Sequence, residues 1–213
     1  PSALNDVLLA SMTVAGSGFN GGGGVGGGVG AGATNASAFQ VGLSTSTAAV
    51  RSGTATLDFA SHNAEMADLA LGSGTVNLTG TVNNYADGAF GLGGGAFMFS
   101  GSGNNFVLDF GNITQGAGAQ SASLNVLNAV FGPSDLLEGA FAFDTGAVQD
   151  FGFSGFNAFS NLIGGGTLGG YQVAFSNTGA LGSYSDDIIL TAFGSNASGY
   201  RDALGDVIRL TVR

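Results

Sequence analysis

The chain has 213 residues, of which 44% are hydrophobic and only 8% are charged, and its formal net charge is −10. Lysine is absent and the few arginines form no cluster, which argues against nucleic acids and anionic membranes as partners because phosphates are bound by clustered basic residues. Cysteine is also absent, which excludes disulfides, thiol catalysis and cysteine-based metal sites.

The same composition bears on where the protein works. Low charge combined with abundant Gly, Ser, Thr, Asn and Ala is typical of bacterial outer surfaces, so we expect a secreted or bacterial cell-surface protein. The first residues, PSALNDVLLASMTV, lack the basic region of a signal peptide. No apolar run approaches the length of about 18 residues that a membrane helix needs, so no membrane span is expected.

In chain order, apolar residues alternate with polar or small residues in many short runs. Such runs include residues 8–14, 76–79, 106–110, 124–127 and 208–213. A period of two between clusters of Gly, Ser and Asn indicates strands. Roughly a dozen runs at close spacing predict an all-β sandwich, and residues 61–72 and 196–206 have room for one helical turn each.

The first low-complexity segment is GSGFNGGGGVGGGVGAGA, residues 16–33. Because glycine this dense loses much backbone entropy on ordering, we predict a surface loop or linker in preference to a closely packed edge. GSGFNG (16–21) matches the dinucleotide pattern G-x-G-x-x-G. That site needs a helix after the glycines, and more glycine follows instead, so we reject a nucleotide site.

A strand-like stretch occurs twice and predicts an internal repeat. FQVGLSTST (39–47) aligns with YQVAFSNTG (171–179), an offset of 171 − 39 = 132 residues. Further blocks follow in the same order: GTATLDFAS (53–61) with DDIILTAFG (186–194), Asn63-Ala64 with Asn196-Ala197, and TVNLTG (75–80) with VIRLTV (207–212). NDVLLASMTV (5–14) can be matched to SDLLEGAFAF (134–143). We therefore predict two β units, residues 1–83 and 84–213, the first including the glycine-rich loop.

The first unit is predicted to be incomplete. The second unit has a lead-in over residues 96–130 that has no counterpart in the first, and 3 of the 17 phenylalanines lie before residue 83. A sandwich that lacks strands has an open edge and exposed apolar surface. Three alternatives follow: the second unit completes the first in cis, another molecule completes it in trans, or upstream strands of a longer protein do so.

Residues 106–130 carry a resemblance to a known family. LDFGNI (108–113), Gly116 and LNVLN (124–128) resemble the first two strands of choice-of-anchor D and ASH-like immunoglobulin-type domains. Residues 151–200 are similar to the C-terminal repeat region of exported bacterial proteins with sorting-type anchors. The resemblance implies two tandem immunoglobulin-like β-sandwich units, the first lacking its initial strands, on a cell-surface or matrix protein. It carries over no catalytic residue.

No residue pattern predicts an enzyme or a cofactor. His62 is the only histidine, no G-x-S-x-G motif is present, and we interpret His62 as an exposed loop residue. Asp186 and Asp187, with Asp202 and Asp206, could bind Ca²⁺, but surface carboxylates that set the charge are the favoured interpretation. FGFSGFNAF (151–159) could stack on sugars, but its alternation favours packing in the core.

The sequence thus predicts a non-enzymatic extracellular structural protein. We expect a subunit of a fibre or layer, such as a biofilm matrix, that self-associates into a homopolymer by β-strand addition, as in donor-strand complementation. Because both ends of the chain are strand-like, the predicted subunit contacts are Leu8, Ala10, Met12, Val14, Ile208, Leu210 and Val212. The alternative is an adhesin or carbohydrate-binding module with a glycan or cell-surface partner.

Overall fold

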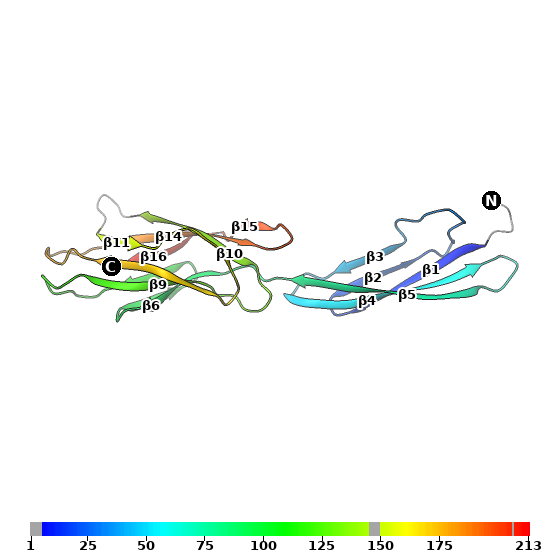
Figure 1. Ribbon diagram of the computed structural model, residues 1–213, viewed down its shortest axis with the longest axis horizontal. Coiled ribbons are helices and arrows are strands. Elements are labelled where there is room, and N and C mark those ends of the chain that lie inside the picture. The colour runs from blue at the N-terminus through cyan, green and yellow to red at the C-terminus, as the bar shows by residue number, and fades with distance from the viewer. Residues whose placement is uncertain (1–5, 145–149, 206) are drawn as a thin grey trace. The chain divides into compact units, whose positions relative to one another are not determined.

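The structure is a computed structural model that describes residues 6–144, 150–205 and 207–213. All secondary structure in these ranges is β, in sixteen strands, which confirms the predicted all-β class. None of the described segments is a helix with the length and hydropathy of a membrane span. The chain forms two compact units, which we call unit 1 (residues 1–82) and unit 2 (residues 83–213) (Figure 1).

Unit 1 is a single antiparallel sheet of five strands. They are β1 (Val7–Gly16), β2 (Phe19–Gly24), β3 (Phe39–Leu43), β4 (Ala49–His62) and β5 (Leu69–Val82), in the order β3-β2-β1-β4-β5. The two longest strands, β4 and β5, pair along nearly their whole length. No second sheet belongs to unit 1 among the described residues, so by itself this unit is one layer of a sandwich.

The polyglycine segment is partly a strand, so the loop predicted for it is wrong over residues 19–24. Gly21 and Gly23 of β2 adopt φ angles of 135° and 140°, which side-chain-bearing residues rarely do. A Cβ on Gly21 would overlap the carbonyl oxygen of Gln40 on the neighbouring strand. Glycine is therefore required because β3 approaches the β2 backbone too closely for any side chain. Residues 25–33 form turns and irregular chain, as predicted.

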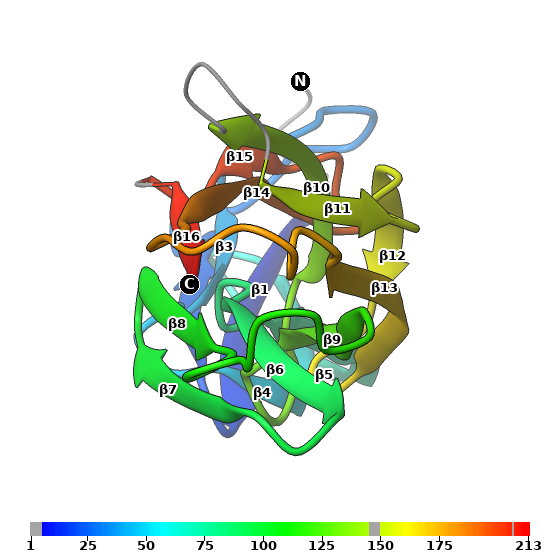
Figure 2. The same ribbon diagram turned by 90° about the vertical axis from the view of Figure 1, so that its left-hand side faces the viewer.

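Unit 2 is a two-layer sandwich. One sheet has the order β12-β10-β14-β16-β8-β7, with β15 pairing β14, and the other has the order β11-β13-β9-β6. Figure 2 shows β16 and β8 on one side of the unit and β13 and β9 on the other. The strands are β6 (Gly88–Gly94), β7 (Met98–Ser102), β8 (Asn105–Asp109), β9 (Gln120–Asn128), β10 (Leu136–Asp144), β11 (Phe151–Ser154), β12 (Phe159–Leu162), β13 (Thr167–Phe175), β14 (Asp186–Ser195), β15 (Arg201–Ala203) and β16 (Ile208–Val212).

The core of unit 2 lies between these sheets. Alternate residues of the central strands point inward, and those with no exposed surface are Leu108, Leu124, Val126, Leu137, Val173, Ile188, Leu190, Leu210 and Val212. Each such side chain contributes about 1.5–3 kcal/mol by burial. Phe151 is also buried, and Phe153, Phe156 and Phe159 pack against the same cluster. The prediction that residues 151–159 anchor the core is confirmed.

The predicted repeat is visible in the pairing register of the first two shared strands. Leu8 of β1 pairs with Ser61 of β4, and Leu137 of β10 pairs with Gly194 of β14. The sequence alignment places Leu8 on Leu137 and Ser61 on Gly194. The strand pairs β1–β4 and β10–β14 therefore have the same register.

The repeat continues into the next strand. Ser61 pairs with Leu69 at the start of β5, and the aligned Gly194 pairs with Asp202 of β15. Three residues after each partner stands a glycine with positive φ, Gly72 at 95° and Gly205 at 87°. The strand is interrupted near this glycine in both units, by a bulge in β5 and by the gap between β15 and β16. The three-strand arrangement β1-β4-β5 thus matches β10-β14-β15/β16, and we call it the shared module.

The same polar contact closes the shared module in both units. In unit 1, Asn63 Nδ2 donates to Asp6 Oδ1 at 2.9 Å, and in unit 2 Asn196 Nδ2 donates to Asp135 Oδ1 at 2.8 Å. Each asparagine also accepts, at 3.0 Å, from the backbone N–H two residues later. This Asp–Asn contact holds the turn after the middle strand against the start of the first strand.

The match between residues 39–47 and 171–179 is not reflected in the topology. β3 is an edge strand of the same sheet as β4. β13 lies in the sheet opposite β14, where it pairs with β9 and β11. The repeat is therefore structural for three strands, whereas the fourth takes a different place because unit 1 has only one sheet to receive it.

Candidate assembly surfaces and loop pocket

The four predicted contact residues of β1 lie on one face of unit 1. Directly paired residues share a face of a sheet, so the pairing registers assign every side chain of unit 1 to one of two faces. The face that contains Leu8 is almost wholly apolar, and we call it the apolar face. Its apolar members include Leu8, Ala10, Met12, Val14, Phe19, Phe39, Val41, Leu43, Ala55, Leu57, Phe59, Leu69, Val76 and Leu78, and its polar members include Ser61 and Arg51.

The opposite face of the same sheet, the polar face, carries hydroxyl, amide and carboxylate groups. Its members include Ser11, Thr13, Asn20, Gln40, Ser52, Thr54, Thr56, Asp58, Ser73, Thr75, Asn77 and Thr79. A sheet with one apolar and one polar face is the usual form of a sheet that is solvated on one side and packed on the other. The sequence alternation therefore specifies a covering layer for unit 1.

The apolar face is partly open in unit 1, where Ala10, Met12 and Ala55 are buried but residues nearer the edges are exposed. Leu69 is 65% exposed, Val76 52%, Val41 41% and Leu8 38%, whereas the aligned Leu137 of unit 2 is fully buried. In unit 2 the sheet β11-β13-β9-β6 covers the corresponding side of the shared module. Among the described residues, no second sheet covers the apolar face in unit 1.

One end of the apolar face is closed because the sheet coils there. A Cβ on Gly80 of β5 would lie 2.9 Å from Leu43 Cδ2 of β3, although three strands separate β3 from β5 in the sheet. Phe19 lies over Gly53, where a Cβ would lie 3.0 Å from its ring. Arg51 marks the rim at this end, where its guanidinium donates to Thr47 Oγ1 at 2.6 Å. The open part is therefore the end that carries Leu8 and Leu69.

Neither predicted contact strand has a free edge. β1 pairs with β2 on one side and β4 on the other, and β16 pairs with β14 and β8. The side chains of Ile208, Leu210 and Val212 are buried in the core of unit 2. β1 and β16 lie in different units. Of the predicted contact residues only Leu8 is exposed, Val14 is half-buried, and Ala10 and Met12 are already buried within unit 1.

The free edges of unit 1 belong to strands that the sequence prediction did not select. Among the described residues, β5 pairs only with β4, and β3 pairs only with β2. β5 has 14 residues, LALGSGTVNLTGTV, with neither charge nor proline. Its outer N–H and C=O groups form a row available to another strand. The sequence signal for this edge is the long uncharged alternation itself, which predicts a strand without predicting its place in the sheet.

Two carboxylates sit at the ends of the shared module. Hydrogen bonds from Ser61 Oγ (2.7 Å) and Asn63 lower the pKa of the Asp6 carboxyl. In unit 2, Glu138 accepts from Ser195 Oγ at 2.6 Å and from Arg201 Nε at 3.0 Å, and these bonds lower its pKa. Both side chains are therefore structural acceptors that stay ionised at neutral pH.

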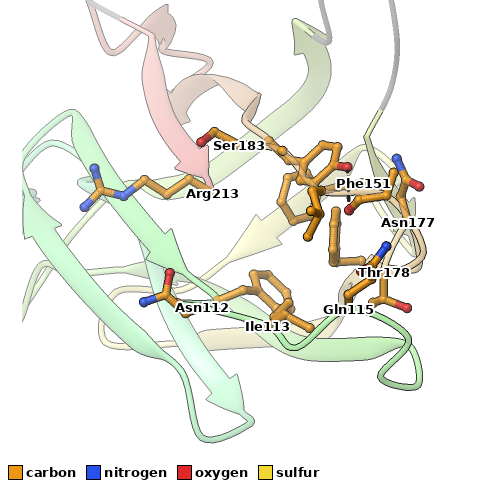
Figure 3. Close-up of a pocket in the computed structure, with 15 residues that line it drawn as sticks. Asn112, Ile113, Gln115, Phe151, Asn177, Thr178, Ser183 and Arg213 are labelled. Carbon is orange, nitrogen blue, oxygen red and sulfur yellow. Dashed lines mark hydrogen bonds between the residues drawn. The ribbon is translucent and has the colours of Figure 1, made fainter.

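Unit 2 carries a pocket of about 310 Å³ between loops (Figure 3). Its apolar lining includes the rings of Phe110, Phe151 and Phe175. Asn112 and Asn177 bring amide groups to the pocket from the loops that follow β8 and β13. These loops are tied together, because Gln115 Nε2 donates to the Gly179 carbonyl at 2.9 Å and Thr178 Oγ1 donates to the Ala117 carbonyl. The lining therefore combines aromatic rings with amide and hydroxyl groups and with the guanidinium of Arg213, whose Nε donates to Asp109 Oδ2 at 3.1 Å.

His62 is the last residue of β4, so its predicted location in a loop is wrong. Its Nδ1 lies 2.7 Å from Asp68 Oδ1, and both side chains remain about half exposed. The neighbouring Ser61 directs its hydroxyl to Asp6. A His–Asp pair needs a third group to serve as a nucleophile, and within the described residues no hydroxyl bonds to His62.

Asp186 and Asp187 point to opposite faces of β14, as adjacent strand residues must. Asp186 is buried, and its Oδ2 accepts from the N–H groups of Asp150 and Phe151 at 3.0 and 2.9 Å. Asp187 Oδ1 accepts from Thr211 Oγ1 at 2.6 Å. Asp202 lies exposed on β15, and the side chain of Asp206 lies outside the described residues. Across the described ranges, no cluster of three or more His, Cys, Asp or Glu side chains is placed to hold a metal ion.

Comparison with known proteins gives no family assignment: no protein-family model matches this chain, and no curated protein matches its sequence significantly.

Proposed function

We propose that this chain is an extracellular structural protein whose copies associate by β-strand addition at the edges of unit 1. The observation that carries the proposal is the free outer edge of β5 in a sheet whose apolar face is also open. An added strand would satisfy the outer N–H and C=O groups of β5, and the alternation of apolar and polar side chains would set its register.

The edge of β5 lacks most devices that natural proteins use to prevent strand addition. Such devices are edge lysines, prolines, inward charges, short strands and bulges. β5 has 14 residues, no charge and no proline, and its single irregularity lies near Gly72. Residues 73–82 of β5 are therefore a continuous template for an incoming strand.

The natural partner of this edge is the other free edge of the same sheet. β3 is formed by residues FQVGL, which alternate in the same way as β5. Contact between β5 of one copy and β3 of the next joins two different surfaces, and such a contact repeats without closing. Repetition gives the fibre or layer expected from the sequence. The low charge and the absence of lysine support an extracellular setting, because they leave few sites for proteolysis.

The experiment compares two double-lysine variants of the full chain. Thr75→Lys with Thr79→Lys places two charges on the edge strand β5, where we expect the mass of polymer to fall at least about tenfold because edge lysines oppose strand addition. Ser11→Lys with Thr13→Lys places the same charge on β1, which is paired on both sides, and should polymerise as the unchanged chain does. Electron microscopy and sedimentation measure the polymer, and equal polymerisation of both variants would refute edge addition.

A second candidate function, a carbohydrate-binding surface module, is favoured by the loop pocket of unit 2. The aromatic lining and the amides of Asn112 and Asn177 are groups that bind neutral sugars. A glycan array with the full chain should then show saturable binding that is lost in Asn112→Ala. Retained binding in that variant, or no binding by the unchanged chain, would contradict this function.

A further inference from the structure

We infer that the apolar face of unit 1 packs against the same face of a second copy of this chain. This contact deepens the proposed function, because both make copies associate, but it uses a face of the sheet where strand addition uses the edges. The two contacts are independent in geometry, so substitutions that remove one leave the other intact.

Unit 2 provides the internal precedent for this contact. Its shared module has the register and the Asp–Asn contact of unit 1, and Leu137, Ile188 and Leu190 on the side that faces the core have no exposed surface. What buries them is a second sheet with alternating apolar residues. The apolar face of unit 1 needs a cover of the same kind, which is an apolar sheet face.

A second copy meets that requirement in both chemistry and size. Among the described residues, two charged side chains lie at the ends of the face: Arg51 at the closed end, and Asp6 at the open end, where its carboxylate accepts from Ser61 and Asn63. The part of the face between them carries no charged side chain in the described residues, so two copies bring no like charges together there. Outside the closed end the five strands contain about 31 residues, because β2 and β3 have only 6 and 5 residues in all. At about 4.8 Å by 3.3 Å for each residue, they present about 490 Å². Two such faces bury about 980 Å², close to the lower bound of about 1,000 Å² for a specific interface.

The packing geometry of such a pair is that of an ordinary β-sandwich. Sheets that pack face to face lie about 10 Å apart with interdigitated side chains. The polar faces of both copies then point to solvent, as the Ser, Thr and Asn side chains of that face require. The edges of β3 and β5 remain free in the pair, so strand addition can extend a two-layer assembly.

The test compares two double-aspartate variants of the full chain on the same two edge strands. Val41→Asp with Val76→Asp places charges on the apolar face, at side chains that are 41% and 52% exposed in the single copy. Gln40→Asp with Thr75→Asp places the same charges one residue away, on the polar face. Any effect of the added charge on the edges of β3 and β5 is therefore the same in both variants. A difference in their association then measures the contribution of the apolar face.

Sedimentation over a range of concentrations measures the association of each variant. The unchanged chain and the polar-face variant should form species built from pairs of copies. The apolar-face variant should associate at least about 100-fold more weakly, because each carboxylate would be buried without a partner. The edge variant Thr75→Lys with Thr79→Lys should stop at the pair, which separates failure of edge addition from failure of face packing.

Two outcomes overturn the inference. Equal association of the apolar-face and polar-face variants would show that the face is not the contact. A chain that stays monomeric at about 100 μM would exclude a second copy as the cover.

Discussion

Leu57 of unit 1 and Leu190 of unit 2 occupy equivalent places in the shared module, yet their surroundings differ. Leu57 pairs with Met12, and Leu190 pairs with the aligned Phe141. Leu190 has no exposed surface, whereas Leu57 is half-buried. Strand pairing and turn contacts therefore form without a second sheet, whereas the complete burial seen at Leu190 depends on one.

The largest difference between the two units is expected when the two equivalent leucines are replaced by alanine. Leu190→Ala leaves a cavity in a closed core and should destabilise unit 2 by about 2–5 kcal/mol. Leu57→Ala on the open apolar face should cost unit 1 less than half as much below the concentration at which copies associate. Native-state hydrogen exchange of the full chain measures each unit separately. Equal losses would mean that the apolar face is already covered within one copy.

A smaller effect is expected from the Asp–Asn contact of each unit. Asn196→Ala removes a donor from the buried Asp135 and should destabilise unit 2 by about 1–3 kcal/mol. Asn63→Ala removes the equivalent donor from Asp6, which is exposed to solvent, so water replaces the bond and the loss should be smaller. Exchange rates of the amides in the two turns would show which substitution costs more stability. A larger loss for Asn63→Ala than for Asn196→Ala would contradict this prediction.

Much of this arrangement follows from local sequence pattern. The alternation over residues 8–14 and 76–79 predicts strands and their apolar sides, and the aligned blocks predict the register shared by the β1–β4 and β10–β14 pairs. These features depend on period-two patterning and turn chemistry, both of which are short-range. The overall all-β class follows from the same signals.

The remaining features depend on distant contacts and were not predictable in this way. Gly21 must be a glycine because β3 lies too close to leave room for a side chain, and no local pattern reveals this contact. β3 and β13 have similar sequences, but β3 is an edge strand and β13 lies between β11 and β9. The order of strands in a sheet is set by which strands are available to pair. For the same reason, β5 could be predicted as a strand but not as the free edge on which the proposed function depends.

The smallest predicted effect concerns the two structural carboxylates. The pKa of Asp6 is lowered chiefly by Ser61 and that of Glu138 chiefly by Ser195, with Arg201 as a second donor. Because the folded-state pKa values lie below the unfolded ones, the stabilisation is present at neutral pH and is lost as the pH falls through the folded-state values.

Removing the serine hydroxyls should therefore change the pKa values of the two carboxyl groups to different extents. In Ser61→Ala the pKa of Asp6 should rise towards 3.8, because the largest cause of its lowering is removed and only the neutral Asn63 remains as a side-chain donor. In Ser195→Ala the pKa of Glu138 should stay clearly below 4.5, because the Arg201 guanidinium still favours the carboxylate. Carboxyl-resolved NMR titration measures both. An unchanged Asp6 pKa in Ser61→Ala would mean that the bond from Asn63 alone fixes the start of the shared module in unit 1.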